Sequence, residues 1–233
     1  MPACYTEWKV NPHHGLEKHA ENLWSVEGKM ENGVLRRMTL AKFADGRIVV
    51  HNAIALEEPL MDEINAWGQV AAVLVPNSFH RMDCRIFRER YPSAKVYAPA
   101  NALKSVGKAT PVDGSYADAP GDATVQVRHL AGIKDSEGII TVQSADGATI
   151  VGNDMIMNTP AASGMVALFT GPTGQLRVPR FARWWWMNNK SALKADLEGL
   201  AATDGLVRVV PGHGPVVVAD AAAKMKNELV ALF

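Results

Sequence analysis

Four apolar runs in this sequence are each followed by a side chain that can bind a metal. His80 follows the first run, His129 ends the second, Asp154 follows the third, and His213 lies in a Pro-Gly-His-Gly-Pro turn after the fourth. Loops at strand ends are where a rigid sheet presents functional groups. Three or four imidazole and carboxylate ligands with one open position make a catalytic metal site. We therefore predict a divalent metal at these residues, with zinc as first choice and manganese or iron(II) as alternatives.

A second carboxylate follows the first histidine at close spacing. Asp83 lies three residues after His80, and we predict that it acts as a general base or orients a metal ligand. The alternative is that both side chains cap a helix that begins near Cys84. For Asn77, the structural interpretation is that it stabilises the turn after Pro76.

The other predicted ligands also have structural interpretations. His129 is either a ligand or a hydrogen-bonded core histidine, and Asp154 is either a ligand or the cap of the following turn. His213 differs, because its flanking glycines permit a sharp turn and close backbone approach, which favours a site role. His51 and Asn52 follow an earlier strand, and we interpret them as structural.

Aromatic and basic residues gather in the least regular part of the chain. The run Trp184-Trp185-Trp186 is close to Arg177, Arg180 and Arg183. Stacking and cation–π contacts would let this segment line a pocket for an anionic or aromatic ligand. Packing of an irregular loop onto the rest of the protein is the other interpretation.

The elements that must position these residues form two similar halves. The first half is predicted to have strands at 23–26, 35–43, 48–50, 71–75 and 95–98, and helices at 57–67, 84–90 and 101–106. The second has strands at 125–130, 138–143, 149–151 and 206–210, and helices at 191–202 and 220–232. Asp-Gly turns join strands in both halves. This pattern predicts a single α/β domain over 1–233, a four-layer αββα sandwich.

Composition excludes several classes of protein. Lysine plus arginine equals aspartate plus glutamate, at 24 each, so no global field attracts nucleic acid or an anionic membrane. No window approaches the roughly 20 apolar residues of a membrane span, and no signal peptide is visible, so a cytoplasmic location is expected. Cys4 and Cys84 fit structural thiols in a reducing compartment.

The order of the four segments resembles that of the metallo-β-lactamase superfamily over nearly the whole chain. A narrower resemblance is to a branch of unknown function within it, carried by Arg37-Met38-Thr39, Gly46 to Asn52, Val75-Pro76-Asn77 with His80, and Tyr91-Pro92 with Val96-Tyr97-Ala98. The resemblance implies the metallo-β-lactamase-like αββα sandwich.

Enzymes of that superfamily carry a Thr-His-x-His-x-Asp-His loop, a later histidine, a bridging aspartate and a histidine in a final Pro-Gly-His-Gly turn. By resemblance His129, Asp154 and His213 take the last three places. The first loop departs from the pattern, since only His80 and Asp83 remain. The resemblance therefore implies one metal, or none, rather than two.

These observations favour a metal-dependent hydrolase acting on a small molecule, in which the metal activates water and polarises a carbonyl or ester. The competing hypothesis is a non-catalytic binding or scaffold protein on the same fold that has lost its metal. It predicts an apolar or water-filled cleft at His213. Redox chemistry at an iron pair is disfavoured, because the first loop supplies too few ligands. Lactam hydrolysis does not follow, because fold does not fix function.

Overall fold

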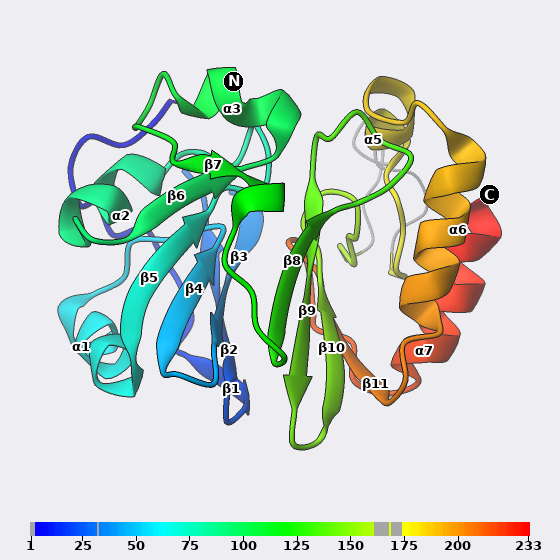
Figure 1. The fold of residues 1–233 in the computed structure, drawn as a ribbon, viewed down its shortest axis with the longest axis horizontal. Coiled ribbons are helices and arrows are strands. Elements are labelled where there is room, and N and C mark those ends of the chain that lie inside the picture. The colour runs from blue at the N-terminus through cyan, green and yellow to red at the C-terminus, as the bar shows by residue number, and fades with distance from the viewer. Residues whose placement is uncertain (1–2, 32, 161–167, 169–173) are drawn as a thin grey trace.

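A computed structural model describes residues 3–31, 33–160, 168 and 174–233. Two β-sheets pack face to face, and helices cover the outer side of each sheet, α1 and α2 on one side and α6 and α7 on the other (Figure 1). This is the four-layer αββα sandwich that the sequence predicts. The two sheets belong to the two halves of the chain.

The first sheet has seven strands in sequence order. It is antiparallel from the first strand to the fourth and parallel from the fourth to the seventh. Its strands are β1 Glu17–Ala20, β2 Leu23–Lys29, β3 Leu35–Lys42, β4 Arg47–His51, β5 Gln69–Leu74, β6 Lys95–Ala98 and β7 Gly114–Ser115. Gly46 takes a φ of +86° in the turn from β3 to β4, a conformation that glycine adopts without strain. The short strands β1 and β7 have no counterpart in the prediction.

Three helices cover the outer face of this sheet, α1 Glu58–Trp67, α2 Cys84–Arg90 and α3 Leu103–Val106. Helix α1 buries Met61 and Ile64, which lie one turn apart on the same face. A single turn of 3-10 helix, η1 Ala100–Ala102, leads into α3, and a second one, η2 Tyr116–Asp118, follows β7. The thiol of Cys84 donates to the carbonyl of Arg81, and burial raises its pKa to about 12.

The second sheet has four strands, in the order β11-β10-β9-β8. They are β8 Val125–His129, β9 Gly138–Ser144, β10 Gly147–Val151 and β11 Leu206–Val210. Its helices are α5 Arg180–Trp185, α6 Lys190–Ala201 and α7 Ala221–Lys224, the last continued by a π-helical turn, η3 Met225–Leu229, and a 3-10 turn, η4 Val230–Leu232. Helix α5 lies in the segment that the sequence left irregular.

Three apolar clusters hold the layers together. One lies between the first sheet and its helices, one between the second sheet and its helices, and one between the two sheets. The middle cluster includes Leu23, Val49, Ile140 and Val210 from both sheets. Burying each such side chain contributes about 1.5–3 kcal/mol relative to leaving it exposed. This middle layer fixes how the strand ends of the two sheets face one another.

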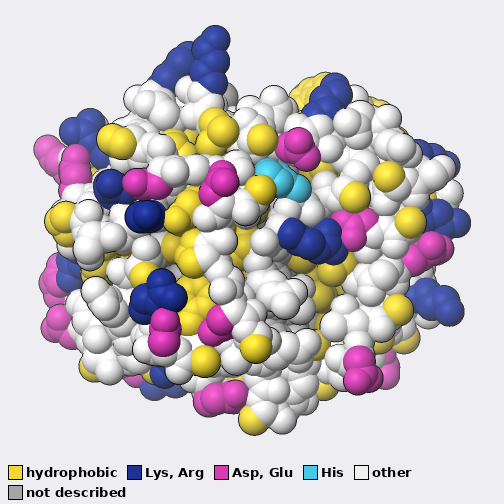
Figure 2. Space-filling view, in the orientation of Figure 1, with side chains coloured by type: hydrophobic (Ala, Val, Ile, Leu, Met, Phe, Trp, Pro, Cys, Tyr) yellow, Lys and Arg dark blue, Asp and Glu magenta, His cyan; other side chains and the backbone are white. Residues whose placement is uncertain are grey.

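The outer surface carries charges of both signs. In Figure 2, lysine, arginine, aspartate and glutamate side chains alternate around this face of the molecule, without a broad region of one charge. Within the described residues, no helix is long and apolar enough to cross a membrane.

Candidate metal centre

Parallel pairing of two strands brings Asp154 and His213 together. Strands β10 and β11 run parallel with Val151 opposite Val210. Asp154 lies three positions after Val151, and His213 lies three positions after Val210. The two loops therefore leave the same edge of the sheet side by side, and the two residues lie at the same distance along them. The Nε2 atom of His213 lies 3.0 Å from Oδ1 of Asp154.

The first sheet adds His80 to this pair. It lies in the loop between β5 and α2, and its Nε2 atom is 3.2 Å from Oδ1 of Asp154 and 3.3 Å from Nε2 of His213. All three side chains are buried, and one ligand atom from each lies within 4.8 Å of the other two. Among the described residues, this is the one group of three or more histidine, cysteine, aspartate or glutamate side chains that meets this spacing.

The two imidazoles are held from behind through their other nitrogen atoms. Nδ1 of His213 donates to the carbonyl of Leu35 at 2.6 Å. Nδ1 of His80 lies 3.1 Å from Oδ1 of Asn52, and the amide nitrogen of Asn52 donates to the carbonyl of Arg37, which fixes the oxygen toward His80. Both histidines therefore carry hydrogen on Nδ1 in their neutral form. The Nε2 lone pairs point into the cluster, as in histidines that bind metals.

Three acceptors therefore converge with no donor between them. When both imidazoles are neutral, the two Nε2 lone pairs and the carboxylate oxygen of Asp154 meet within hydrogen-bonding distance, and only a proton or a cation relieves their repulsion. Burial lowers the pKa of His80. Burial also acts to lower the pKa of His213, but the hydrogen bond to Asp154 and its charge outweigh that effect and raise it. In the metal-free protein the proton belongs on His213.

A second buried carboxylate, which the sequence did not single out, holds the loop that carries Asp154. Glu137 accepts from the backbone N–H groups of Asn153, Asp154 and Met155 at 2.8–3.1 Å, and from the side-chain amide of Asn77 at 3.1 Å. The amide of Asn77 also donates to Oδ2 of Asp154 at 2.9 Å. Because most of its partners are backbone groups, Glu137 leaves no motif in the sequence.

Two buried carboxylates at the cluster have no lysine or arginine among the described residues to neutralise them. Asp154 and Glu137 are 5% and 0% exposed, and neither forms an ion pair with a described lysine or arginine. Burial raises the pKa of Glu137, as does the charge of Asp154, whereas the interactions with His80 and His213 hold the pKa of Asp154 well below its usual range. Buried carboxylates are normally paired or coordinate a metal. The donor set and the charge both fit a divalent cation.

The turn that presents His213 depends on its two glycines. A Cβ at Gly212 would lie 2.2 Å from Oδ1 of Asn153, and one at Gly214 would lie 2.0 Å from the carbonyl of Asn158. Gly214 also has a φ of +92°. Any other residue would clash and force the backbone to move. The Pro-Gly-His-Gly motif thus places the imidazole by close backbone contact.

Asp83 lies near the cluster but contacts none of its three members. One carboxylate oxygen forms a buried ion pair with Arg36, and the other accepts from the backbone N–H of Ala55 at 3.0 Å. Asp83 occupies the N-cap position of α2 without making a side-chain cap hydrogen bond. The charge of Arg36 in turn opposes protonation of both histidines, although the pKa of His213 is raised overall by Asp154. Among the described residues, Arg36 is therefore the side chain that connects Asp83 to the cluster.

The structure does not bring His129 to the cluster. Its Nε2 atom accepts from the backbone N–H of Ala100 at 3.2 Å, and its ring stacks on Tyr116. The reason is its strand. β8 is the edge strand, separated from β10 by β9, and two strand spacings amount to roughly 10 Å. Its hydrogen bond agrees with the alternative interpretation of a hydrogen-bonded core histidine, but His129 is only partly buried.

Of the two residues that the sequence interprets as structural, Asn52 gains a role at the cluster and His51 does not. Asn52 was interpreted as structural, but it sets the tautomer of His80 from a left-handed conformation with a φ of +57°. His51 is buried with its Nε2 atom unpartnered among the described residues, and burial lowers its pKa to about 3. It is therefore neutral in the protein.

The aromatic and basic segment divides into buried and exposed parts. Trp186 is buried, whereas Trp184 and Trp185 are 58% and 56% exposed. Arg177 is fully buried and donates to the hydroxyl of Thr159, with two of its nitrogen atoms unpartnered in the described part of the chain. No ion pair joins Arg177, Arg180 or Arg183 to a described acidic residue.

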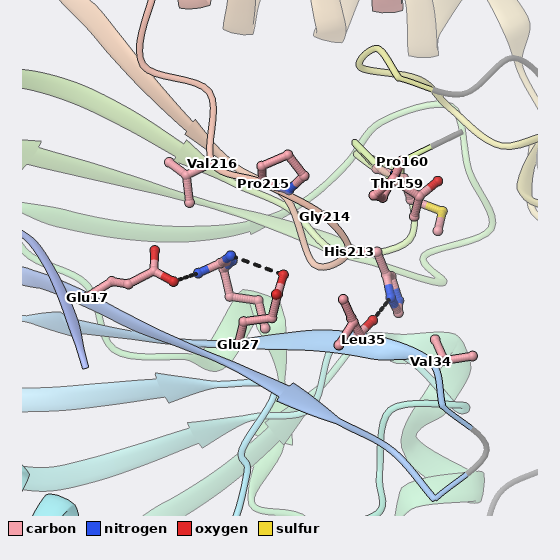
Figure 3. A pocket seen from close by; sticks show the side chains of 12 residues that line it. Glu17, Glu27, Val34, Leu35, Thr159, Pro160, His213, Gly214, Pro215 and Val216 are labelled. Carbon is pink, nitrogen blue, oxygen red and sulfur yellow. Dashed lines mark hydrogen bonds and ion pairs between the residues drawn. The ribbon is translucent and has the colours of Figure 1, made fainter. Parts of the chain in front are cut away.

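A cavity of about 670 Å³ opens beside His213. In Figure 3 the imidazole lies at one end, against Leu35, while Glu17 and Glu27 lie at the other, where they form ion pairs with Arg37. The rest of the wall is mainly apolar, with Val34, Met157, Pro160, Pro215 and Val216 among the lining residues. This volume falls in the range of small-molecule sites.

The sequence matches no protein-family profile and no curated protein sequence. The structure is similar to the DIM-1 metallo-β-lactamase exposed to ceftazidime, with a TM-score of 0.62 and 15% identity over 94% of this chain and 97% of that one. FIM-1 from Pseudomonas aeruginosa in its mono-zinc form has a TM-score of 0.60 and 12% identity, over 97% of this chain and 98% of that one. VMB-1 has a TM-score of 0.63 and 13% identity, over 96% of this chain and 98% of that one. The chain therefore has the metallo-β-lactamase fold.

Proposed function

We propose that this protein is a metal-dependent hydrolase that holds one divalent cation between His80, Asp154 and His213. The observation that carries the proposal is the convergence of two Nε2 lone pairs and a carboxylate oxygen within 3.3 Å of one another. Two imidazoles and a carboxylate suit zinc, manganese or iron(II). When bound, the metal would supply Lewis acidity that polarises a substrate carbonyl or ester and makes water a better nucleophile at neutral pH.

Asn77 supports one metal rather than two. By the superfamily pattern it lies near the position of the first histidine of the metal-binding loop. Its amide N–H groups are directed at the carboxylates of Asp154 and Glu137, at 2.9 and 3.1 Å. A donor in this position satisfies the lone pairs that a second cation would need. The mono-zinc form of FIM-1 is a protein of the same fold described with one zinc.

The remaining residues would orient the ligands. Asn52 and the carbonyl of Leu35 hold the two imidazoles, and Glu137 fixes the loop of Asp154. The sequence predicts Asp83 as a base or an orienting group. We propose the orienting role, through Arg36, because both of its oxygens are already engaged. The substrate would be a small molecule bound next to the metal centre, where cavities adjoin both His213 and Asp154.

Metal analysis tests this proposal directly. Protein purified without a histidine tag should bind about one equivalent of zinc, manganese or iron, and replacing His213 by alanine should abolish binding. Less than about a tenth of an equivalent, with no rise after metal addition, would contradict the proposal. The metal-loaded protein should hydrolyse members of a panel of small esters, amides and lactones, and chelation should stop the reaction.

The competing function is a non-catalytic binding protein, and one observation favours it. It predicts a cleft at His213, and a largely apolar cavity lies there. Less than about a tenth of an equivalent of metal after zinc, manganese or iron is added, together with no turnover of any panel member, would support this alternative over the hydrolase.

A further inference from the structure

A second and smaller pocket lies over Asp154, on the side of α5. Its volume is about 280 Å³, and the described side chains that line it are Phe79, Asp154, Phe181 and Trp185. Three aromatic rings thus form its walls, and the only polar lining side chain among them belongs to the candidate metal centre. A group bound in this pocket would lie next to the carboxylate of Asp154.

Exposed aromatic side chains gather at this pocket. Among the described residues, the large aromatic side chains classed as exposed are Phe79, Trp184 and Trp185, at 36%, 58% and 56%. Two of these three line the pocket. Leaving large apolar side chains in water is unfavourable, and exposed apolar surface at a concave site is typical of ligand binding.

The walls are held in place before any ligand binds. Phe181 and Trp185 are one turn apart on α5, with ring centroids 6.0 Å apart. Behind them the buried ring of Trp186 contacts Phe181 edge-on, at 6.0 Å and 80°, and Phe79 at 6.2 Å. Because these contacts exist already, little side-chain freedom is lost when a ligand enters.

We propose that this pocket binds an aromatic ring of the substrate, so that the substrates are aryl-substituted esters or amides whose scissile carbonyl lies at the metal centre. The inference rests on the proposed function, because it places the ring relative to that centre. A cavity of about 150 Å³ is enough for benzene. A volume of about 280 Å³ therefore accommodates one ring and a short linker. Aromatic walls favour a ring through stacked and edge-on contacts beyond simple area burial.

Three hydroxamates test the inference, because the hydroxamate group chelates a metal with an open position. Acetohydroxamate reports the metal centre alone. Phenylacetohydroxamate adds an aromatic ring on a one-carbon linker, and cyclohexylacetohydroxamate adds a saturated ring of similar size. Binding to the zinc-loaded full-length protein is measured by calorimetry, after the zinc content of each sample has been determined.

Two neighbouring tryptophans provide matched variants. Trp185→Ala removes a wall of the pocket, whereas Trp184→Ala removes an equally exposed ring from the same helix that does not line it. We expect phenylacetohydroxamate to bind at least about tenfold more tightly than acetohydroxamate. Trp185→Ala should reduce this gain to less than about threefold, and Trp184→Ala should preserve it.

The outcomes separate this inference from the proposed function. If acetohydroxamate does not bind the zinc-loaded protein, the proposed function fails, and the inference that rests on it fails too. If acetohydroxamate binds and the phenyl group adds nothing, or if its gain survives in Trp185→Ala, only the inference is overturned. An equal gain from the cyclohexyl group would show that the pocket does not select aromatic rings, which also overturns it.

Discussion

The Nε2 atoms of His80 and His213 lie 3.3 Å apart, although 133 positions separate the two residues in the sequence. Each ring carries its hydrogen on the far nitrogen, where Asn52 or the carbonyl of Leu35 accepts it. The lone pairs of two neutral imidazoles repel each other at this distance, so a proton or a cation must lie between the two Nε2 atoms. The pair therefore defines the position of the predicted cation.

Replacing His213 by alanine should remove metal binding and leave the fold intact. The turn rests on Gly212, Gly214 and the flanking prolines, and two remaining ligands are too few to complete a site. We expect metal affinity to fall by at least about 100-fold. Metal content after dialysis and far-ultraviolet circular dichroism would measure both effects. His129→Ala is the matched control and should keep its metal. Loss of metal from that variant would return His129 to the ligand set.

Metal affinity should depend on pH through His213. Burial opposes its protonated form, but Asp154 outweighs this and raises its pKa above 6.5, so a cation must displace one proton. Below that raised pKa the apparent affinity should increase about tenfold per pH unit, and above it the affinity should level off. Competition with a chromophoric chelator between pH 6 and 9 would measure the slope. A flat profile would show that no proton occupies the site.

The metal-free protein should lose stability as the pH rises. Because the pKa of His213 is higher in the folded state, its contribution to stability is complete below pH 6.5 and is lost as the pH passes the raised value. Urea unfolding in the presence of a chelator, at several pH values from 6 to 9, would show the decline. In Asp154→Asn the decline should become smaller, because the carboxylate that raises the pKa of His213 is gone, whereas burial still raises the pKa of Glu137 and keeps part of the decline.

Glu137→Gln should weaken both the fold and the metal site. The new amide group would place a donor against the backbone N–H groups of Asn153, Asp154 and Met155. We expect the free energy of unfolding to fall by about 2–4 kcal/mol and metal affinity to fall 10- to 100-fold. Glu198→Gln, on the exposed face of α6, should change neither. Unchanged metal affinity in a destabilised Glu137→Gln protein would limit Glu137 to a structural role.

Two glycine substitutions should have opposite effects. Gly214→Ala places a methyl group 2.0 Å from the carbonyl of Asn158 at a φ of +92°, and should lower the free energy of unfolding by at least about 2 kcal/mol. Gly199→Ala lies in helix α6 with open space around its Cβ, and should stabilise the protein by about 0.5–1 kcal/mol. Thermal and urea unfolding of both variants would check the signs.

The strand pattern predicted most of the fold, because periodicity and turn residues are local properties. Strands β6 and β11 and helix α2 begin and end where the sequence predicts. The contacts of His129 differ from its predicted role because an edge strand and a central strand have the same local pattern. Only the order of the strands shows that β8 lies two positions from β10. Glu137 was missed because its partners are mostly backbone N–H groups, which any sequence supplies.

Different interactions connect the two halves of the chain at the two ends of the sandwich. At the end of the β9–β10 hairpin, Asn22 joins the sheets by hydrogen bonds to the carbonyl of Gln143 and the hydroxyl of Ser144, at 2.8 and 2.6 Å. At the opposite end, His80 comes from the first half of the chain, and Asp154 and His213 come from the second. A cation bound there would cross-link the two halves. Hydrogen bonds would then join the two sheets at one end of the sandwich, and a metal ion would join the two halves at the other end.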